Sequence, residues 1–290
     1  MTDLCSQPAL LSLHAALNKI QHALSPIIGE ESITLPHALG RIVSQPCFAP
    51  FPSPAFANSA MDGYALHSSD IQQPSFTLKQ VGISWAGQPY TGIVKQGECI
   101  RIFTGAVLPA ELDTVVMQEQ VITKDKVIHF SEPITAEQNI RHVGEDSQTG
   151  DELLPANKCL TAIDLGLLAA AGIYELKVKR KIRVAFFSTG DELVPIGTEL
   201  KAGQIYDSNR YTLNALLSDP CHTITDLGVL ADDKQLIKNS LLAASENHDV
   251  IISTGGASVG EADFIKTVLD EIGRVNFWKL AVKPGKPLAF

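Results

Sequence analysis

The sequence predicts a multidomain chain with an α/β domain, a β-rich domain and a discontinuous helical domain. Strand and helix patterns alternate from residue 181 onward, and short β-prone runs separated by Gly and Pro fill residues 76–130. Apolar residues at helical spacing occur on both sides of that β-rich stretch. With 290 residues and 45% apolar composition, the chain is long enough for one large domain or two to three modest ones.

Apolar side chains recur at helical spacing near the N-terminal end. They are Leu10, Leu13, Leu17, Ile20 and Leu24. Residues three and four apart share one face of a helix, so the spacing predicts an amphipathic helix that ends at Pro26 and Gly29. Four prolines follow between residues 46 and 54, and the composition then changes to β-prone runs. This change places a domain boundary near residue 48.

The second stretch predicts a compact β-rich domain. Strands are expected at 76–83, 99–104, 114–118 and 127–130. Helical spacing returns at residues 161–171, with Ile163, Leu167 and Leu168 as its apolar positions. We expect this helix to pack beside the N-terminal helix. Residues 1–47 and 142–180 would then form one discontinuous linker and dimerisation domain, with residues 48–141 as the β-rich domain between them.

From residue 181 onward, strands and helices alternate. Strands are expected at 182–187, 224–230 and 250–253, and helices at 211–217 and 235–244. This alternation specifies parallel strands joined by crossover helices. The runs 184–187 and 250–252 are apolar throughout, as expected when helices cover both faces of a sheet. Residues 181–290 are therefore predicted to form an α/β domain, with a further strand at 277–283.

Charge and composition exclude several classes of protein. The net charge is −9 and no long basic tract is present, which argues against a nucleic-acid binder. The apolar run at residues 10–13 is too short for a signal or membrane segment, so we expect a cytoplasmic protein without a membrane partner. Five widely spaced cysteines indicate reduced thiols, and the eight histidines show no paired metal-ligand spacing.

Small residues, carboxylates and lysines follow the predicted strands of the α/β domain. The first group is Ser188, Thr189, Gly190, Asp191 and Glu192, the second is Gly255, Gly256 and Ser258 with Asp263 in the helix beyond, and the third is Lys279, Lys283, Pro284, Gly285 and Lys286. Ligands of open α/β sheets bind beyond the carboxyl ends of the strands. Glycines let an oxyanion approach backbone amides, and carboxylates hold divalent cations. The pattern therefore predicts an enzyme site for phosphate-like anions and a metal ion.

Each group also has an ordinary structural explanation. Asp191 and Glu192 beside a turn are typical of helix caps, and an acid such as Asp263 in a first helical turn is favoured by the helix dipole. Lysines on an edge strand are common as solvated side chains. For the lysines we favour the functional explanation, because lysines on a buried sheet face are costly unless an anion meets them.

Six segments of the sequence together carry a resemblance to a known family. They are residues 58–65, 102–106, 188–193, 204–210, 255–263 and 279–287. In this order and at this spacing, they resemble the molybdopterin molybdenumtransferase family, which includes the E domain of gephyrin. One segment alone is a weak signal, whereas the combination is specific and covers most of the chain from Asn58 onward.

The resemblance implies a reaction and its partners. It implies magnesium-dependent insertion of molybdate into adenylylated molybdopterin with release of AMP. It further implies a homodimer whose active cleft lies between the α/β domain of one protomer and the β-rich part of its mate, and contact with the molybdopterin adenylyltransferase. Because the protein is acidic while both substrates are anionic, attraction would have to be local.

The resemblance also implies roles for individual residues. The implied catalytic residues are Asp62, Thr104, Glu192, Asp232, Asp263, Lys279 and Lys283, with Glu192 and Asp232 as the magnesium ligands. The implied substrate-binding residues are Ser188, Thr189, Gly190, Asp191, Asp207, Asn209, Gly255, Gly256, Ser258, Pro284, Gly285 and Lys286. Without the resemblance, Asp62 would be an ordinary turn residue and Thr104 an ordinary strand end.

The sequence departs from the family pattern at Phe290, beyond which the family continues with further α/β elements and a β-rich domain. We expect an incomplete α/β domain without that C-terminal domain. Two alternatives stay open. One is a non-catalytic pterin-binding or scaffold fragment of the same fold. The other is a nucleotide-handling enzyme of the competence-damage-inducible type, which shares the Thr-Gly-Asp-Glu-Leu loop but lacks segments like residues 58–65 and 283–287.

Overall fold

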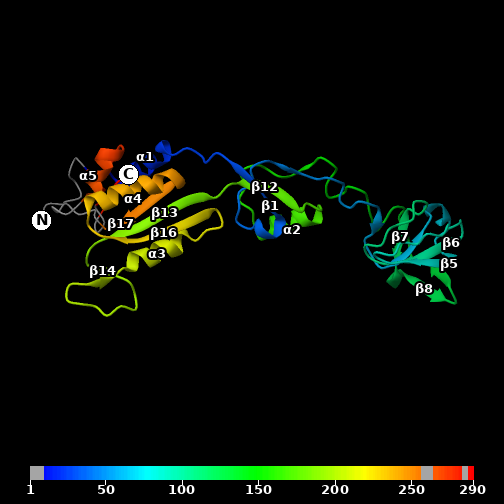
Figure 1. Cartoon of the computed structure of the whole chain (residues 1–290). Helices are drawn as coiled ribbons and strands as arrows, with labels where there is room; N and C mark the ends of the chain where they lie inside the picture. Colours follow the sequence, from blue (N-terminus) through cyan, green and yellow to red (C-terminus); the bar gives the residue numbers. More distant parts are fainter. Residues whose placement is uncertain (1–9, 256–263, 283–286) are drawn as a thin grey trace. The chain divides into compact units, whose positions relative to one another are not determined.

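A computed structural model of the chain describes residues 10–255, 264–282 and 287–290 (Figure 1). The chain divides into two compact units. One unit contains residues 1–45, 156–165 and 175–290, and the other contains residues 46–155 and 166–174. Together they confirm the predicted class, a multidomain protein with α/β and β-rich parts. The three-domain division by residue number remains a prediction.

The β-rich unit is built on a six-stranded sheet with the order β7-β4-β6-β5-β9-β8. Its strands are β4 (Gly63–Leu66), β5 (Phe76–Ser84), β6 (Glu98–Ile102), β7 (Thr114–Met117), β8 (Val121–Lys124) and β9 (Val127–Phe130). Each of the four predicted strands corresponds to one of these, although β6 ends at Ile102 rather than at residue 104. One apolar cluster centres on Ile100, Ile102 and Val115, and a second centres on Leu66, Ile128 and Phe130.

Short elements complete the β-rich unit. Antiparallel pairs join β2 (Cys47–Phe48) to β11 (Glu152–Leu154) and β3 (Asn58–Ser59) to β10 (Ile140–Arg141). Two 3-10 helices, η3 (Ser68–Asp70) and η4 (Gln118–Gln120), follow β4 and β7. These pairs bring the two chain passages that flank the sheet side by side.

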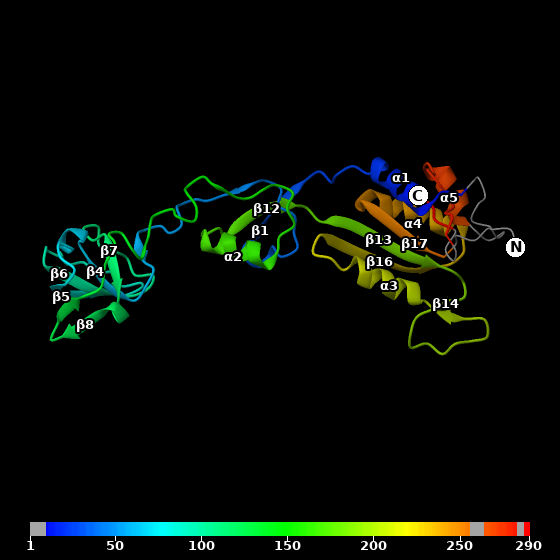
Figure 2. The same cartoon turned by 180° about the vertical axis from the view of Figure 1, so that it is seen from behind.

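The other unit contains a parallel sheet with β13 (Ile182–Thr189) between β16 (His222–Leu230) and β17 (Val250–Thr254). Its helices are α3 (Ser208–Leu217), α4 (Lys234–Asn247) and α5 (Phe264–Ile272). Figures 1 and 2 show α3 and α4 on opposite sides of the sheet. Residues 184–187 are all buried, as predicted for a central strand covered on both faces. Phe187 packs with Ile237 of α4 and with Ile265 of α5.

The same unit also contains an antiparallel pair of β1 (Glu30–Thr34) and β12 (Glu175–Lys179). The 3-10 helix η2 (Leu35–His37) follows β1. The helix α2 (Ala162–Ala170), which the division between the two units cuts after residue 165, precedes β12 in the chain. A short parallel pair, β14 (Leu193–Val194) with β15 (Ile205–Tyr206), lies between β13 and α3 in the sequence. These elements show that distant parts of the chain meet in this unit.

The N-terminal helix α1 (Leu13–Ala23) packs differently from the prediction. Its buried residue is Ala16, which clusters with Phe277 and Leu280, whereas Leu13 and Leu17 are 54% and 49% exposed. The expected contact with the helix at residues 161–171 is therefore replaced by contact with the C-terminal stretch. The strand predicted at 277–283 is also wrong, because its described residues form only isolated bridges between Leu11 and Leu280 and between Lys279 and Pro287.

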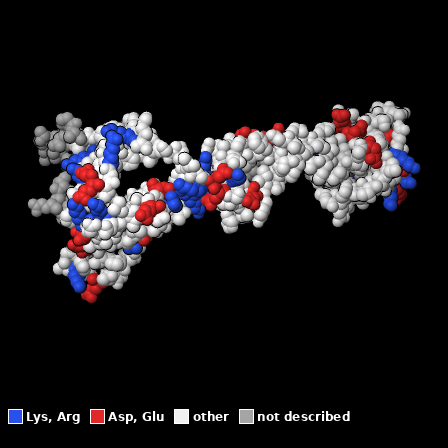
Figure 3. Space-filling view, turned by 45° about the horizontal axis from the view of Figure 1, so that its top comes forward, with Lys and Arg blue, Asp and Glu red and all other residues white. Residues whose placement is uncertain are grey.

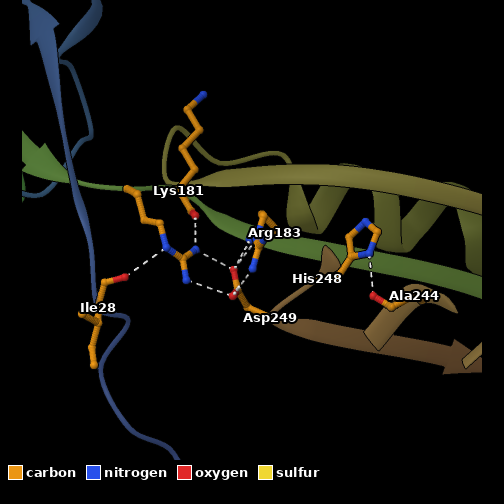
Figure 4. Close-up of polar contacts among 7 residues, drawn as sticks. Ile28, Lys181, Arg183, Ala244, His248 and Asp249 are labelled. Atoms are coloured by element: carbon orange, nitrogen blue, oxygen red, sulfur yellow. Dashed lines mark hydrogen bonds and ion pairs between the residues drawn. The ribbon is translucent and has the colours of Figure 1, made fainter. Parts of the chain in front are cut away.

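Asp249 joins two arginines at the start of the parallel sheet (Figure 4). Its carboxylate accepts hydrogen bonds from the guanidinium groups of Arg180 and Arg183 at 2.7–3.3 Å and from the Arg183 amide at 2.9 Å. Arg180 Nε also donates to the Ile28 carbonyl at 3.1 Å. These bonds, first those from Arg180, lower the pKa of Asp249 far below its usual value. We call this cluster the Asp249 knot.

Two further observations bear on the expectations from composition. No helix among the residues that the structure describes combines the length and apolar character that a bilayer span requires. The four described cysteines, Cys47, Cys99, Cys159 and Cys221, are free thiols. On the face shown in Figure 3, acidic and basic side chains are interspersed.

A capping box at the start of α2 makes stability depend on pH. The Asp164 carboxylate accepts from the amide and hydroxyl of Thr161 at 2.9 and 2.7 Å and pairs with Lys158 at 2.6 Å. The Lys158 hydrogen bond and then those of Thr161 lower the pKa of Asp164 from 3.8 to about 2. We expect Asp164→Asn to reduce the free energy of unfolding by about 1 kcal/mol at pH 7.

Because the folded-state pKa is depressed, the stabilisation by Asp164 is present above pH 3.8 and is lost as the pH falls toward 2. Urea unfolding of the wild type and the variant at several pH values measures this difference. Thr161→Ser is the matched control because it keeps the hydroxyl. A gap in stability that stays constant down to pH 2 would contradict the explanation.

Candidate functional site

The end of β13 and the end of β17 form the centre of the first candidate site. The Ser188 and Thr254 hydroxyls are hydrogen-bonded at 3.0 Å across these neighbouring strands. Thr189 is 2% exposed, and its Oγ1 has no hydrogen-bond partner among the described residues. Gly190 and Gly255 then leave the strands with φ values of 146° and 84°. The structure therefore brings together the two strand ends from which the predicted loops begin.

Gly255 is needed where the ends of β13 and β17 meet. A Cβ at this position would lie 2.1 Å from the Thr189 carbonyl oxygen and 3.0 Å from Thr189 Oγ1. A backbone oxygen at that distance cannot be accommodated without moving a strand. The Thr189 hydroxyl, which has no partner among the described residues, thus lies where the ends of β13 and β17 approach too closely for a side chain at position 255.

Three carboxylates follow the same end of the sheet. The Asp232 amide donates to Asp191 Oδ1 at 3.3 Å, which places the loop after β16 beside the loop after β13. Burial, and then the charges of Asp191 and Glu192, raise the pKa of Asp232. Across the described ranges, no group of three His, Cys, Asp or Glu side chains is positioned to hold a metal ion. The cluster is therefore acidic and mutually repulsive.

Asp207 has two different oxygens. Its Oδ1 accepts from the Arg210 amide at 3.1 Å and so caps α3, whereas its buried Oδ2 has no partner among the described residues. Asn209 lies in the first turn of α3 and is exposed. Helix capping accounts for Oδ1 of Asp207 but not for Oδ2, because buried polar atoms are normally hydrogen-bonded.

Among the predicted residues beyond Gly255, the structure describes only Lys279, whose side chain is exposed. Gly256, Ser258, Asp263, Lys283, Pro284, Gly285 and Lys286 lie outside the described residues. Their predicted roles therefore stay predictions.

The second candidate site lies at one end of the six-stranded sheet of the β-rich unit. Asp62 Oδ1 accepts from the Thr104 amide at 2.8 Å and from its hydroxyl at 2.7 Å. The bonds from Thr104, with a further contribution from Arg101, lower the pKa of Asp62, so the carboxylate is charged at neutral pH. The two residues predicted to act together in this unit are thus in direct contact.

Other residues emerge at the same end of the sheet and were not predicted. Asp62 precedes β4, Thr104 follows β6, Trp85 follows β5 and Gln118 follows β7. Arg101 donates to the Gly63 carbonyl at 3.0 Å and to the Gln118 side chain. Strand direction would have identified Arg101, Trp85 and Gln118 as neighbours of this site. The ends of β5 and β6 lie at the same end of the sheet as the start of β4, because β5 and β6 are parallel and β4 is antiparallel to β6.

Replacing Gly255 tests the close approach of the ends of β13 and β17. Gly255→Ala combines a left-handed backbone conformation with the contact to the Thr189 carbonyl, whereas Gly203→Ala places a Cβ at a similar φ of 87° with nothing within 4 Å. We expect about 1 kcal/mol of destabilisation for Gly203→Ala and about 3 kcal/mol for Gly255→Ala. Urea unfolding measures both. Equal losses would show that the Thr189 contact has no energetic weight.

Comparisons with known proteins agree with this arrangement. Residues 11–172 match the family described as the MoeA N-terminal region, domains I and II, and residues 185–290 match the family described as a probable molybdopterin binding domain. The molybdopterin molybdenumtransferase of Haemophilus influenzae is 45% identical over 97% of this chain and 70% of its own length. That of Nostoc sp. is 37% identical over 89% of this chain and 60% of its own length.

Solved structures show the same fold. Two structures of the molybdopterin biosynthesis MoeA protein from Pyrococcus horikoshii superpose with TM-scores of 0.80 and 0.84, at 33% and 28% identity. Each comparison covers 97% of this chain and 71% or 72% of the other. The chain thus spans about 60–72% of the length of these relatives. From its sequence and its structure, the chain belongs to the molybdopterin molybdenumtransferase family.

Proposed function

We propose that this chain acts in molybdenum cofactor biosynthesis by inserting molybdate into adenylylated molybdopterin, with magnesium and with release of AMP. The observation that carries the proposal is the buried hydroxyl of Thr189, which has no partner among the described residues and lies where the ends of β13 and β17 meet. A buried donor without a partner is costly, so a ligand oxygen at this position would stabilise the site. The curated relatives named above supply the reaction class.

Magnesium fits the chemistry of the acidic cluster. Asp191, Glu192 and Asp232 offer carboxylate oxygens, the ligands that magnesium prefers. Burial, and then the charges of Asp191 and Glu192, raise the pKa of Asp232, and a cation would offset the repulsion among these charges. We assign Glu192 and Asp232 as the protein ligands. A bound magnesium ion would supply positive charge beside the phosphate oxygens of the substrate.

The residues of the chain itself bind and orient the anions. Thr189 donates its hydroxyl, the loops at Gly190 and Gly255 let the substrate approach the backbone, and Lys279 contributes local positive charge. Asp62 and Thr104 act from the β-rich unit. In a homodimer, we propose that this second wall is supplied by the partner subunit, and that the cytoplasmic enzyme receives its substrate from the molybdopterin adenylyltransferase.

The test is release of AMP from adenylylated molybdopterin by purified protein with magnesium. We expect release to be faster when molybdate is added, because insertion and cleavage are coupled by proximity. Lys279→Ala should slow the molybdate-dependent rate by about tenfold, whereas Lys201→Ala, which removes another exposed lysine, should not. Binding of the substrate without any AMP release would instead favour a non-catalytic pterin-binding protein.

A further inference from the structure

Three flat groups are stacked at the end of the six-stranded sheet. The rings of Trp85 and Phe103 are 4.0 Å apart between centroids and are inclined by only 8°. The guanidinium carbon of Arg101 lies 4.7 Å from the Phe103 centroid and 5.1 Å from that of Tyr64. Aromatic stacking and cation–π contacts are both favourable. We call Arg101, Phe103 and Trp85 the stacked triad.

The triad is held in place by the backbone. Arg101 is fixed by its bonds to the Gly63 carbonyl and to Gln118. Trp85 is carried on a tight turn in which its amide and carbonyl exchange hydrogen bonds with those of Gln88, both at 3.0 Å, and Gly87 supplies the φ of 78° that the turn requires. A group that binds to the triad would therefore meet a preorganised surface.

Packing within the unit does not account for the indole. Trp85 is 48% exposed, and neither of the two apolar clusters described for this sheet includes Trp85 or Phe103. The triad instead adjoins the polar pair of this site, because Phe103 precedes Thr104 and Thr104 bonds Asp62. An exposed aromatic face beside a charged carboxylate suits a ligand that is flat and carries nitrogen-bound hydrogens.

We propose that the exposed face of Trp85 binds a planar nitrogen heterocycle by stacking, and that this ring is the pterin of the substrate. The inference rests on the proposed function for the identity of the ring. A pterin offers a flat, electron-poor surface to the electron-rich indole. Its ring nitrogens can donate to Asp62. The adenine of the adenylyl group is the other flat ring of the substrate, and the experiment separates the two.

Tryptophan fluorescence tests the proposal without any turnover. The chain has two tryptophans, Trp85 and Trp278, so Trp278→Phe leaves Trp85 as the reporter and Trp85→Phe leaves Trp278. Each variant is titrated with free pterin and with AMP, in the absence of magnesium and molybdate. We expect pterin to quench the fluorescence of Trp278→Phe in a saturable way. In Trp85→Phe, we expect only the inner-filter effect that is caused by light absorption by the pterin. Quenching of Trp85 by AMP but not by pterin overturns the assignment of the ring.

Calorimetric titration with pterin gives the size of the effect. Trp85→Ala should weaken binding by about tenfold, and Trp85→Phe should recover most of the loss. Ile122→Ala, which removes a 66% exposed side chain from β8 of the same sheet, should leave the affinity unchanged. If pterin binds all of these variants equally while Trp85→Ala changes the oligomeric state, the triad is a subunit contact and the proposal is wrong.

The two proposals fail separately. If the protein releases no AMP but pterin still quenches the fluorescence of Trp85, the proposed reaction is wrong and the stacking site stands. Normal AMP release without Trp85 quenching contradicts the stacking site alone.

Discussion

Asp232→Asn is expected to reduce AMP release by about 100-fold or more without lowering the stability of the protein. The carboxylate is one of the two magnesium ligands proposed above, and a metal ion contributes several kcal/mol to the stabilisation of developing charge. Asparagine keeps the shape of the side chain and the backbone amide that donates to Asp191. The loss would therefore reflect the missing charge rather than a changed loop.

The pKa of Asp232 decides the expected effect on stability. Because folding raises this pKa, the folded state binds a proton more readily than the unfolded chain does. The contribution of Asp232 to stability is therefore present below its unfolded-state pKa and is lost as the pH rises through the folded-state value. At pH 7 the carboxylate costs stability, and Asp232→Asn should leave the free energy of unfolding unchanged or slightly higher.

The neighbouring Asp233 provides the control. Its side chain caps α4 by accepting from the Leu236 amide at 2.7 Å, and asparagine caps helices about as well as aspartate. Asp233→Asn should thus change neither activity nor stability. AMP release measured beside urea unfolding distinguishes the variants, and a large loss of stability in Asp232→Asn would show that its carboxylate has a structural role instead.

Phe187→Ala should destabilise the α/β part by about 3–5 kcal/mol. Phe187 is fully buried on the central strand and packs with Ile237, Leu241 and Val268 from the two helices on that face. Truncation removes most of a ring from this cluster, and a three-stranded sheet held between helices can close the space only in part.

Leu242→Ala is the matched control for the core truncation, because Leu242 follows Leu241 on α4 but is 44% exposed. We expect a loss below about 1 kcal/mol for this variant. Thermal and urea unfolding of both variants measure the difference. Similar losses for Phe187→Ala and Leu242→Ala would mean that the cluster around β13 is not the stabilising core.

Local sequence patterns predicted much of the fold. The alternation from residue 181 onward located β13, β16 and β17 and the helices α3 and α4, because a buried parallel strand is apolar throughout and its crossover helix is periodic. Pairing between distant segments leaves no such local pattern. The β1–β12 pair joins residues 30–34 to residues 175–179, and nothing in either segment alone specifies the other.

The errors have similar causes. The spacing of Leu13 and Leu17 correctly predicted that this segment is a helix, but it wrongly predicted that these two side chains are buried. A periodic pattern does not identify the surface against which a helix packs. Alternation at residues 277–282 resembled a strand, although only isolated bridges form there. In the second site, Asp62 and Thr104 were found by resemblance, whereas Arg101 and Trp85 require knowledge of which strand ends meet.

The Asp249 knot limits how the chain can bend near the parallel sheet. The chain passes this point twice, once at Ile28 before β1 and again at Arg180 after β12, and Arg180 bonds both the Ile28 carbonyl and Asp249. Movement of either passage would break bonds that also hold the other. One arginine side chain therefore couples the residues on both sides of the β1–β12 pair to the start of β17.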